Sequence, residues 1–87
     1  MRWLKLSAGL TVFGIMVDHR DQNAPNMQEV ITKYGRDIIG RMGVPSPSKE
    51  QGLITLIYEG ESKNATTFRK ELEDISGVTV QTITFMQ

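Results

Sequence analysis

The sequence predicts an α+β domain with a four-stranded antiparallel sheet and two helices on one face of that sheet. Strand and helix patterns alternate along the chain in the order β-α-β-β-α-β. The first and third strand patterns, over residues 10–17 and 53–58, are largely apolar at both odd and even positions. We therefore expect both of these strands to be covered on both sides. With 87 residues, the chain has the length of a single domain.

This element order, with right-handed βαβ crossovers, gives the ferredoxin-like βαββαβ sandwich with strand order 4-1-3-2. In that order the first and third strands lie in the middle of the sheet. Their apolar patterning predicts the same central place for these two strands, so two independent arguments agree.

The first helix pattern follows a polar loop over residues 18–25. Its apolar positions have the spacing i, i+3, i+4 and i+7, and they are Met27, Val30, Ile31 and Tyr34. Asn26 and Glu29 have the spacing of a capping box, which predicts a start near Asn26, although Pro25 allows a slightly earlier one. Gly35 is predicted to end the helix in the left-handed conformation.

A second helix pattern covers residues 64–75, after a charged loop over residues 59–63. Its apolar stripe consists of Ala65, Phe68, Leu72 and Ile75. Gly77 follows at the place where a left-handed residue is expected to end the helix.

The remaining strand patterns, over residues 38–44 and 78–85, are predicted to lie at the sheet edges. The first contains Gly40 and Gly43, which weaken a strand and often mark a bulge or a close approach of backbones. The second begins with alternating apolar and polar residues, as expected of a half-exposed strand. Residues 45–52 are predicted to form a turn-rich hairpin connection.

Two helices cover only one face of a four-stranded sheet. The opposite face, called the open face below, is predicted to carry one apolar row from each central strand. A monomer rarely exposes a patch of that kind. We therefore expect a homodimer or homotetramer in which the open face packs against another copy.

Composition excludes several classes of function. Ten Lys and Arg residues balance ten Asp and Glu residues, so we expect neither direct nucleic-acid binding nor membrane binding. The chain has one His and no Cys, which excludes a thiolate metal site and a site that needs several His. It also has no glycine-rich phosphate loop and no nucleophile–base set. We expect no catalytic residue, no metal, no cofactor and no enzyme activity.

Residues 1–9 are interpreted as an extension that precedes a single domain over residues 10–87. The basic start and the apolar run from Leu6 to Val17 imitate a signal peptide, but no small-x-small cleavage site follows Val17. Cleavage there would also remove the first strand of the sheet. We therefore expect a cytoplasmic protein.

Four residues are candidates for ligand binding. Asp18, His19 and Arg20 follow the first strand, where the imidazole and the carboxylates beside it offer ligand atoms. Arg41, in the second strand, offers a guanidinium group suited to a carboxylate or a phosphate. The alternative interpretations are a solvated turn at residues 18–21 and an edge-strand Arg that limits edge-to-edge association.

Three segments carry a family resemblance. They are Val17-Asp18-His19-Arg20, Arg41-Met42-Gly43-Val44-Pro45 and Ile75-Ser76-Gly77-Val78-Thr79-Val80-Gln81-Thr82. Together they resemble a small family of regulators of the iron-only hydrogenase system, and the similarity extends from residue 10 to about residue 82. It implies a ferredoxin-like domain related to ACT domains and to the ligand-binding domain of the nickel-responsive repressor. The several His and the Cys of that repressor's nickel site have no counterpart in this chain.

The resemblance and the open face together predict a small non-catalytic regulatory domain. It is expected to act as an oligomer and to sense a small effector near the loop that follows the first strand. The alternative is a structural interaction module without a small-molecule ligand, which docks onto a partner protein through its sheet or an edge strand.

Overall fold

The computed structural model describes residues 9–18, 20–45 and 51–86. In this part of the chain the elements follow the order β1-α1-β2-β3-α2-β4, with a short 3₁₀ helix, η1, before β2. Their bounds are Gly9–Val17 (β1), Arg20–Lys33 (α1), Gly35–Asp37 (η1), Ile38–Pro45 (β2), Gly52–Gly60 (β3), Ser62–Glu73 (α2) and Val78–Met86 (β4). The predicted α+β ferredoxin-like fold is confirmed.

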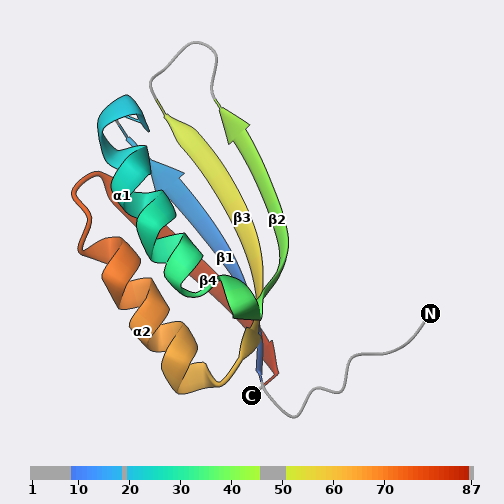
Figure 1. Cartoon of the computed structure of the whole chain (residues 1–87). Helices are drawn as coiled ribbons and strands as arrows, with labels where there is room; N and C mark the ends of the chain where they lie inside the picture. Colours follow the sequence, from blue (N-terminus) through green and yellow to red (C-terminus); the bar gives the residue numbers. More distant parts are fainter. Residues whose placement is uncertain (1–8, 19, 46–50, 87) are drawn as a thin grey trace.

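The strands form one antiparallel sheet with the order β2-β3-β1-β4, which is the predicted order 4-1-3-2 seen from the other edge. Both helices lie on the same face of this sheet (Figure 1). The central strands β1 and β3 pair without a shift from Gly9↔Gly60 to Val17↔Gly52. The pairing of each edge strand contains one irregularity, so the regular centre is bounded by two less regular edges.

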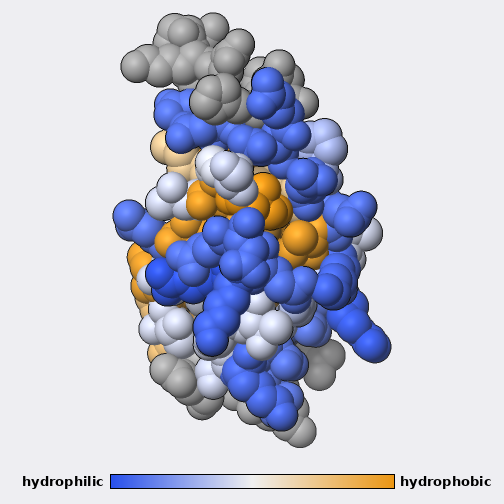
Figure 2. All heavy atoms as spheres, turned by 90° about the vertical axis from the view of Figure 1, so that its left-hand side faces the viewer, coloured by the Kyte–Doolittle hydropathy of each residue, from blue (hydrophilic) through white to orange (hydrophobic). Residues whose placement is uncertain are grey.

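The core lies between the sheet and the two helices, and the ring of Phe68 on α2 is at its centre. That ring has no exposed surface. Its centroid lies 4.9 Å from that of Phe13, 4.5 Å from that of Tyr34 and 5.8 Å from that of Tyr58. The outer surface of the helices is mainly hydrophilic, with apolar side chains visible between the polar ones (Figure 2). The helix side of the domain is therefore an ordinary solvent-facing surface.

The first helix begins at Arg20 and not near Asn26, so the predicted loop over residues 18–25 is wrong for most of its length. The reason is a contact that the local pattern does not reveal. The side-chain amide of Asn23 donates a hydrogen bond to the backbone carbonyl of Asp18, with an N–O distance of 2.6 Å. This bond ties the first helical turns to the end of β1.

Pro25 consequently lies inside α1, where it removes one backbone hydrogen bond. Ala24 and Met27, on either side of it, pack against or within the core. Their burial offsets the missing bond, so tertiary packing overrides the start signal in the local sequence.

The loop predicted over residues 59–63 is also largely wrong, because β3 continues to Gly60 and α2 begins at Ser62. Gly77 has a φ of 82°, which confirms the predicted left-handed stop after the second helix. Gly35 differs from its prediction. It is the first residue of η1 and is not among the positive-φ glycines of the described residues.

Candidate functional site

The open face of the sheet carries many exposed apolar side chains, and all four strands contribute to it. The prediction of one apolar row from each central strand is confirmed. The larger members of the face have exposed fractions between 37% and 65%, and they are Met16, Met42, Val44, Leu53, Ile57 and Ile83. An uncovered apolar surface of this extent is typical of an interaction site.

The edge strands make the open face larger than predicted. Ile83 of β4 lies beside Val12 of β1, and Ile57 of β3 lies on the other side of Val12. At the far edge, Val44 of β2 pairs with Leu53 of β3. Apolar residues therefore cross the sheet from one edge to the other.

Gly14 lies in the middle of the open face, between Thr55 of β3 and Gln81 of β4. A Cβ atom at Gly14 would meet no atom closer than the Gln81 carbonyl oxygen, at 3.8 Å. The centre of the face thus has no side chain of its own. It leaves space for a side chain of a facing molecule.

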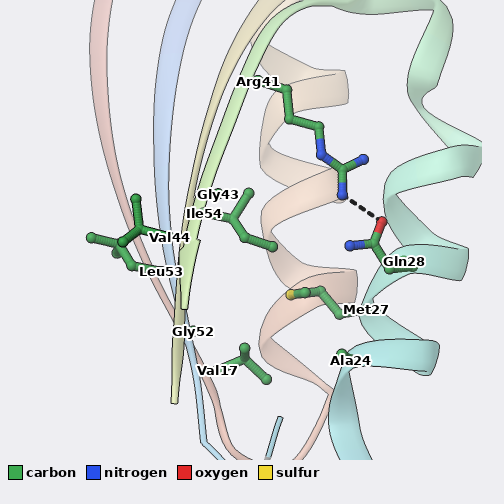
Figure 3. A pocket seen from close by; sticks show the side chains of 10 residues that line it. All are labelled: Val17, Ala24, Met27, Gln28, Arg41, Gly43, Val44, Gly52, Leu53 and Ile54. Carbon is green, nitrogen blue, oxygen red and sulfur yellow. Dashed lines mark hydrogen bonds between the residues drawn. The ribbon is translucent and has the colours of Figure 1, made fainter. Parts of the chain in front are cut away.

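A groove lies between the N-terminal half of α1 and the adjacent ends of β2 and β3 (Figure 3). We call it the α1–β2 groove, and its volume is about 220 Å³. Its apolar side chains on the helix side of the sheet are Val17, Ala24, Met27 and Ile54. The apolar lining suits a small molecule with an apolar body.

Small residues keep this groove open. Gly43 and Gly52 line it without side chains, and Ala24 contributes only a methyl group from α1. A Cβ atom at Gly43 would meet only Cγ1 of Ile54, at an ordinary contact distance of 3.8 Å. The space at Gly43 is therefore a true gap between α1 and the sheet.

Arg41 and Gln28 are the polar side chains of the α1–β2 groove (Figure 3). Nη2 of Arg41 donates a hydrogen bond to Oε1 of Gln28, with a distance of 2.7 Å, and both groups are solvent-exposed. No acidic side chain in the described part of the chain forms an ion pair with Arg41. The groove therefore carries one positive charge whose hydrogen-bond partner is neutral.

Val44 and Leu53 belong to both surfaces. They line the groove, yet their side chains point away from α1 and are 55% and 44% exposed on the open face (Figure 3). A molecule bound in the groove would touch the same two strand positions that form part of the open face. The two surfaces are thus joined through the thickness of the sheet.

The candidate residue Asp18 makes contacts within the domain. Its Oδ1 accepts a hydrogen bond from Nε2 of Gln51 at 2.6 Å, and its backbone N–H donates to the carbonyl of Gly77 at 2.8 Å. Asp18 therefore joins the end of β1 to the start of β3 and to the turn before β4.

The other candidates are placed differently. Arg20 is the first residue of α1, and His19 lies outside the described residues. Arg41 lines the α1–β2 groove, as does Val17, the neighbour of Asp18. The structure therefore brings the end of β1 and Arg41 to one groove, but Asp18 itself is not among the lining residues.

The groups with shifted pKa values lie away from the groove. A hydrogen bond to Glu71 raises the pKa of Tyr34 to about 12, and a hydrogen bond from Lys33 lowers the pKa of Glu71. Burial, together with the charge of Asp37, raises the pKa of Tyr58. These shifts belong to contacts at the other end of α1, so they point to stability and not to acid–base chemistry in the groove.

A second pocket, of about 270 Å³, lies between α2 and β4. Its polar lining residues are Thr11, Ser62, Thr66, Arg69, Thr82 and Thr84. The guanidinium of Arg69 already pairs with Glu73 at 3.4 Å and donates to Thr82 at 3.3 Å. Because its cation is already partnered by a carboxylate, this pocket is a weaker candidate than the α1–β2 groove.

The described residues contain no cluster of three or more potential metal-ligating side chains. None of their helices combines the length and the apolar character needed to cross a membrane.

The fold is shared with a protein of known structure. No curated protein matches the chain significantly. A solved structure from Thermotoga maritima, described as "uncharacterized protein TM1266", is similar with a TM-score of 0.83 and 24% sequence identity, over 87% of this chain and 95% of that one. The family model "TM1266-like: Iron-only hydrogenase system regulator, putative" matches residues 9–82. Because this match spans well over half of the chain, the chain belongs to the TM1266-like family.

Proposed function

We propose that this chain is a non-catalytic regulatory domain that forms a homodimer through its open face and responds to a small effector in the α1–β2 groove. The description of the family as a regulator supports the regulatory role. The observation that carries the proposal is the double placement of Val44 and Leu53, which line the groove and also form part of the open face.

The size of the open face fits a second copy of the chain. Four strands about 4.8 Å apart and about 30 Å long present roughly 600 Å² in projection. A specific interface buries about 800 Å² of accessible surface per partner, and accessible surface exceeds projected area. The open face is thus large enough for a face-to-face pair of sheets, and its apolar character resembles that of a homodimer interface.

Two-fold symmetry also suits this surface. A two-fold axis near the centre of the face brings Gly14 of each copy close to the partner, where no side chain obstructs the approach. The exposed apolar side chains around it, such as Met42 and Ile83, would then be covered. A second copy therefore covers the apolar side chains of the whole open face in one interface.

The effector would act by shifting the population of two dimer arrangements. Such a shift requires different affinities for the two arrangements. The groove provides a physical basis for the difference, because Val44 and Leu53 line it and also lie on the open face. No bond is made or broken in this mechanism.

The test is to fill the groove from within and to measure the dimer dissociation constant. Gly43→Leu places a side chain in the gap beside Ile54, while Gly35→Leu adds the same atoms at an open position outside the groove. We expect the first variant to change the dissociation constant by at least about fivefold (about 1 kcal/mol), and the second to leave it unchanged. Equal constants for both variants and the wild type would contradict the coupling.

The second candidate function, a structural interaction module, is favoured by the open face taken alone. It needs a different protein on that face and gives the groove no role. It therefore predicts a monomer for the isolated chain, and no effect of Gly43→Leu on partner binding. The dissociation measurement separates the two candidates.

A further inference from the structure

The α1–β2 groove has a chemical character that narrows the class of its ligand. We propose that it binds a small monocarboxylate with an apolar body. Arg41 and Gln28 hold the carboxylate, and the body lies against Val17, Met27 and Ile54. This inference deepens the proposed function and rests on it only in naming the ligand as the effector.

The charge of the groove selects an anion with a single negative charge. The guanidinium of Arg41 presents paired N–H groups that match the two oxygens of a carboxylate. In the structure Nη2 of Arg41 donates to Oε1 of Gln28 at 2.7 Å. This amide oxygen occupies the position that a ligand carboxylate oxygen would take. Among the described side chains that line the groove, Arg41 is the only cation, so a second negative charge would have no partner among them.

Gln28 can change from acceptor to donor without moving its backbone. Half a turn about its last side-chain bond exchanges Oε1 for Nε2, which carries two N–H groups. One carboxylate can then accept from Arg41 and from Gln28 together. Figure 3 shows the Gln28 amide between α1 and the sheet, at the groove that the ligand would enter.

The size and lining of the groove define the rest of the ligand. The volume of about 220 Å³ limits the ligand to a small molecule. Burial of an apolar body against the lining is favourable, whereas an inorganic anion gains nothing of this kind. The fit is therefore to a small branched aliphatic or aromatic acid.

The test uses the full chain, amide chemical shifts in NMR titrations, and four probes. Benzoate and isovalerate have the proposed chemistry, benzamide lacks the charge, and acetate lacks the apolar body. We expect at least one of the first two to shift the amides of Ala24, Gly43 and Gly52. We also expect it to bind at least tenfold more tightly than benzamide or acetate.

Two variants with matched controls assign the contacts. Arg41→Gln is expected to weaken the binding of the carboxylate at least tenfold and to abolish its advantage over benzamide. Arg36→Gln removes an exposed Arg outside the groove and should change nothing. Gly43→Leu should weaken the carboxylate and benzamide alike. Gln28→Leu repeats the test of the contact to the ligand carboxylate without changing the sheet. Thermal unfolding of each variant verifies that it is folded.

The proposal is overturned if neither carboxylate binds at millimolar concentration, or if benzamide binds as tightly as benzoate. It is also overturned if the shifts map to the pocket around Arg69 instead. The oligomeric state, measured without probes, keeps this failure separate from that of the proposed function. If the chain is a dimer that binds neither carboxylate, only the proposed ligand class is contradicted. If it is a monomer that binds benzoate in the groove, only the dimeric mechanism is contradicted.

Discussion

The hydroxyl of Tyr34 donates a hydrogen bond to a carboxylate oxygen of Glu71, and this bond joins the residue that follows α1 to the last part of α2. Lys33 donates to the other oxygen of the same carboxylate at 2.6 Å, and the Tyr34 ring stacks on Phe68. We call this contact the α1–α2 clasp. It anchors α1 at its C-terminal end, opposite the half that lines the groove.

The clasp predicts that the tyrosines ionise at a higher pH in the folded protein than in the unfolded chain. The pKa of Tyr34 is raised to about 12 by its bond to Glu71, and that of Tyr58 is raised by burial. Since a raised pKa favours the protonated form, Tyr34 contributes stability below pH 10 that is lost as the pH rises through about 12. Ultraviolet titration should show little tyrosinate at pH 10 in the native protein, and Glu71→Gln should restore earlier ionisation of one tyrosine. A native titration that matches that of the urea-unfolded chain would refute this.

The acid side of the same contact gives a second prediction. The pKa of Glu71 is lowered from its ordinary value of 4.5, so the folded state favours its ionised form. The carboxylate therefore contributes stability above about pH 4.5, and this contribution is lost as the pH falls through the lower pKa of the folded state. The melting temperature of the wild type should exceed that of Glu71→Gln at neutral pH, and the difference should vanish in acid. Glu29→Gln removes an exposed carboxylate of α1 that lies outside the clasp, and it serves as the control. A difference in melting temperature between the wild type and Glu71→Gln that does not depend on pH would argue against the clasp.

Phe68 is predicted to be the most costly residue of the core to truncate. Phe68→Ala removes contacts with three rings and leaves a cavity, at a cost of about 3–5 kcal/mol. Because that cost approaches the whole stability of a small domain, Phe68→Leu provides a milder version that remains folded. Thr67→Ala alters the exposed neighbour and should stay within about 0.5 kcal/mol of the wild type in urea unfolding. Comparable losses for Phe68→Leu and Thr67→Ala would show that the ring cluster does not stabilise the core.

The two glycines that follow the helices should respond differently to alanine. At Gly77, with φ of 82°, a Cβ would lie 2.6 Å from Nδ2 of Asn23 and 3.3 Å from the Asp18 carbonyl, so Gly77→Ala should cost about 1–3 kcal/mol. At Gly35 a Cβ meets nothing within 4 Å, so Gly35→Ala should be neutral or stabilising by up to about 1 kcal/mol. Urea unfolding of the two variants tests the contrast, which equal effects would contradict.

The elements follow from the sequence because their patterns repeat. The alternation in β1 predicts that Phe13 and Val12 lie on opposite faces of the sheet. The structure confirms this and shows which face is which, because Phe13 is buried in the core. The pattern fails where a single contact decides. The capping signal at Asn26 predicts a later start of α1 than the structure shows, because the pattern does not reveal the hydrogen bond that Asn23 donates to the Asp18 carbonyl.

The candidate site was only partly predictable for the same reason. Arg41 was a candidate because of its residue type, and it lines the groove. The groove itself depends on Gly43 and Ala24, two small residues that are distant in sequence and line it from different elements. The sequence pattern does not reveal Ile83 as a member of the open face, because the polar residues Thr79 and Gln81 at the start of β4 indicate a solvent-exposed strand face.

A charge on the open face should prevent dimerisation and leave the fold intact. Met42 is 65% exposed in the single chain, so Met42→Glu meets no steric barrier in the monomer, but it would bury an unpaired charge in a face-to-face dimer. Thr66→Glu places the same charge on the exposed surface of α2 and should have no effect. Size-exclusion chromatography, with circular dichroism to verify folding, distinguishes the variants. If Met42→Glu and Thr66→Glu elute alike, the open face is not the contact.

The central claim is that two copies of this chain cover each other's open faces. Sedimentation equilibrium of the unmodified chain at micromolar concentration measures this directly as a mass. The account predicts twice the chain mass, with dissociation only on strong dilution. A mass equal to that of one chain throughout the micromolar range would contradict it.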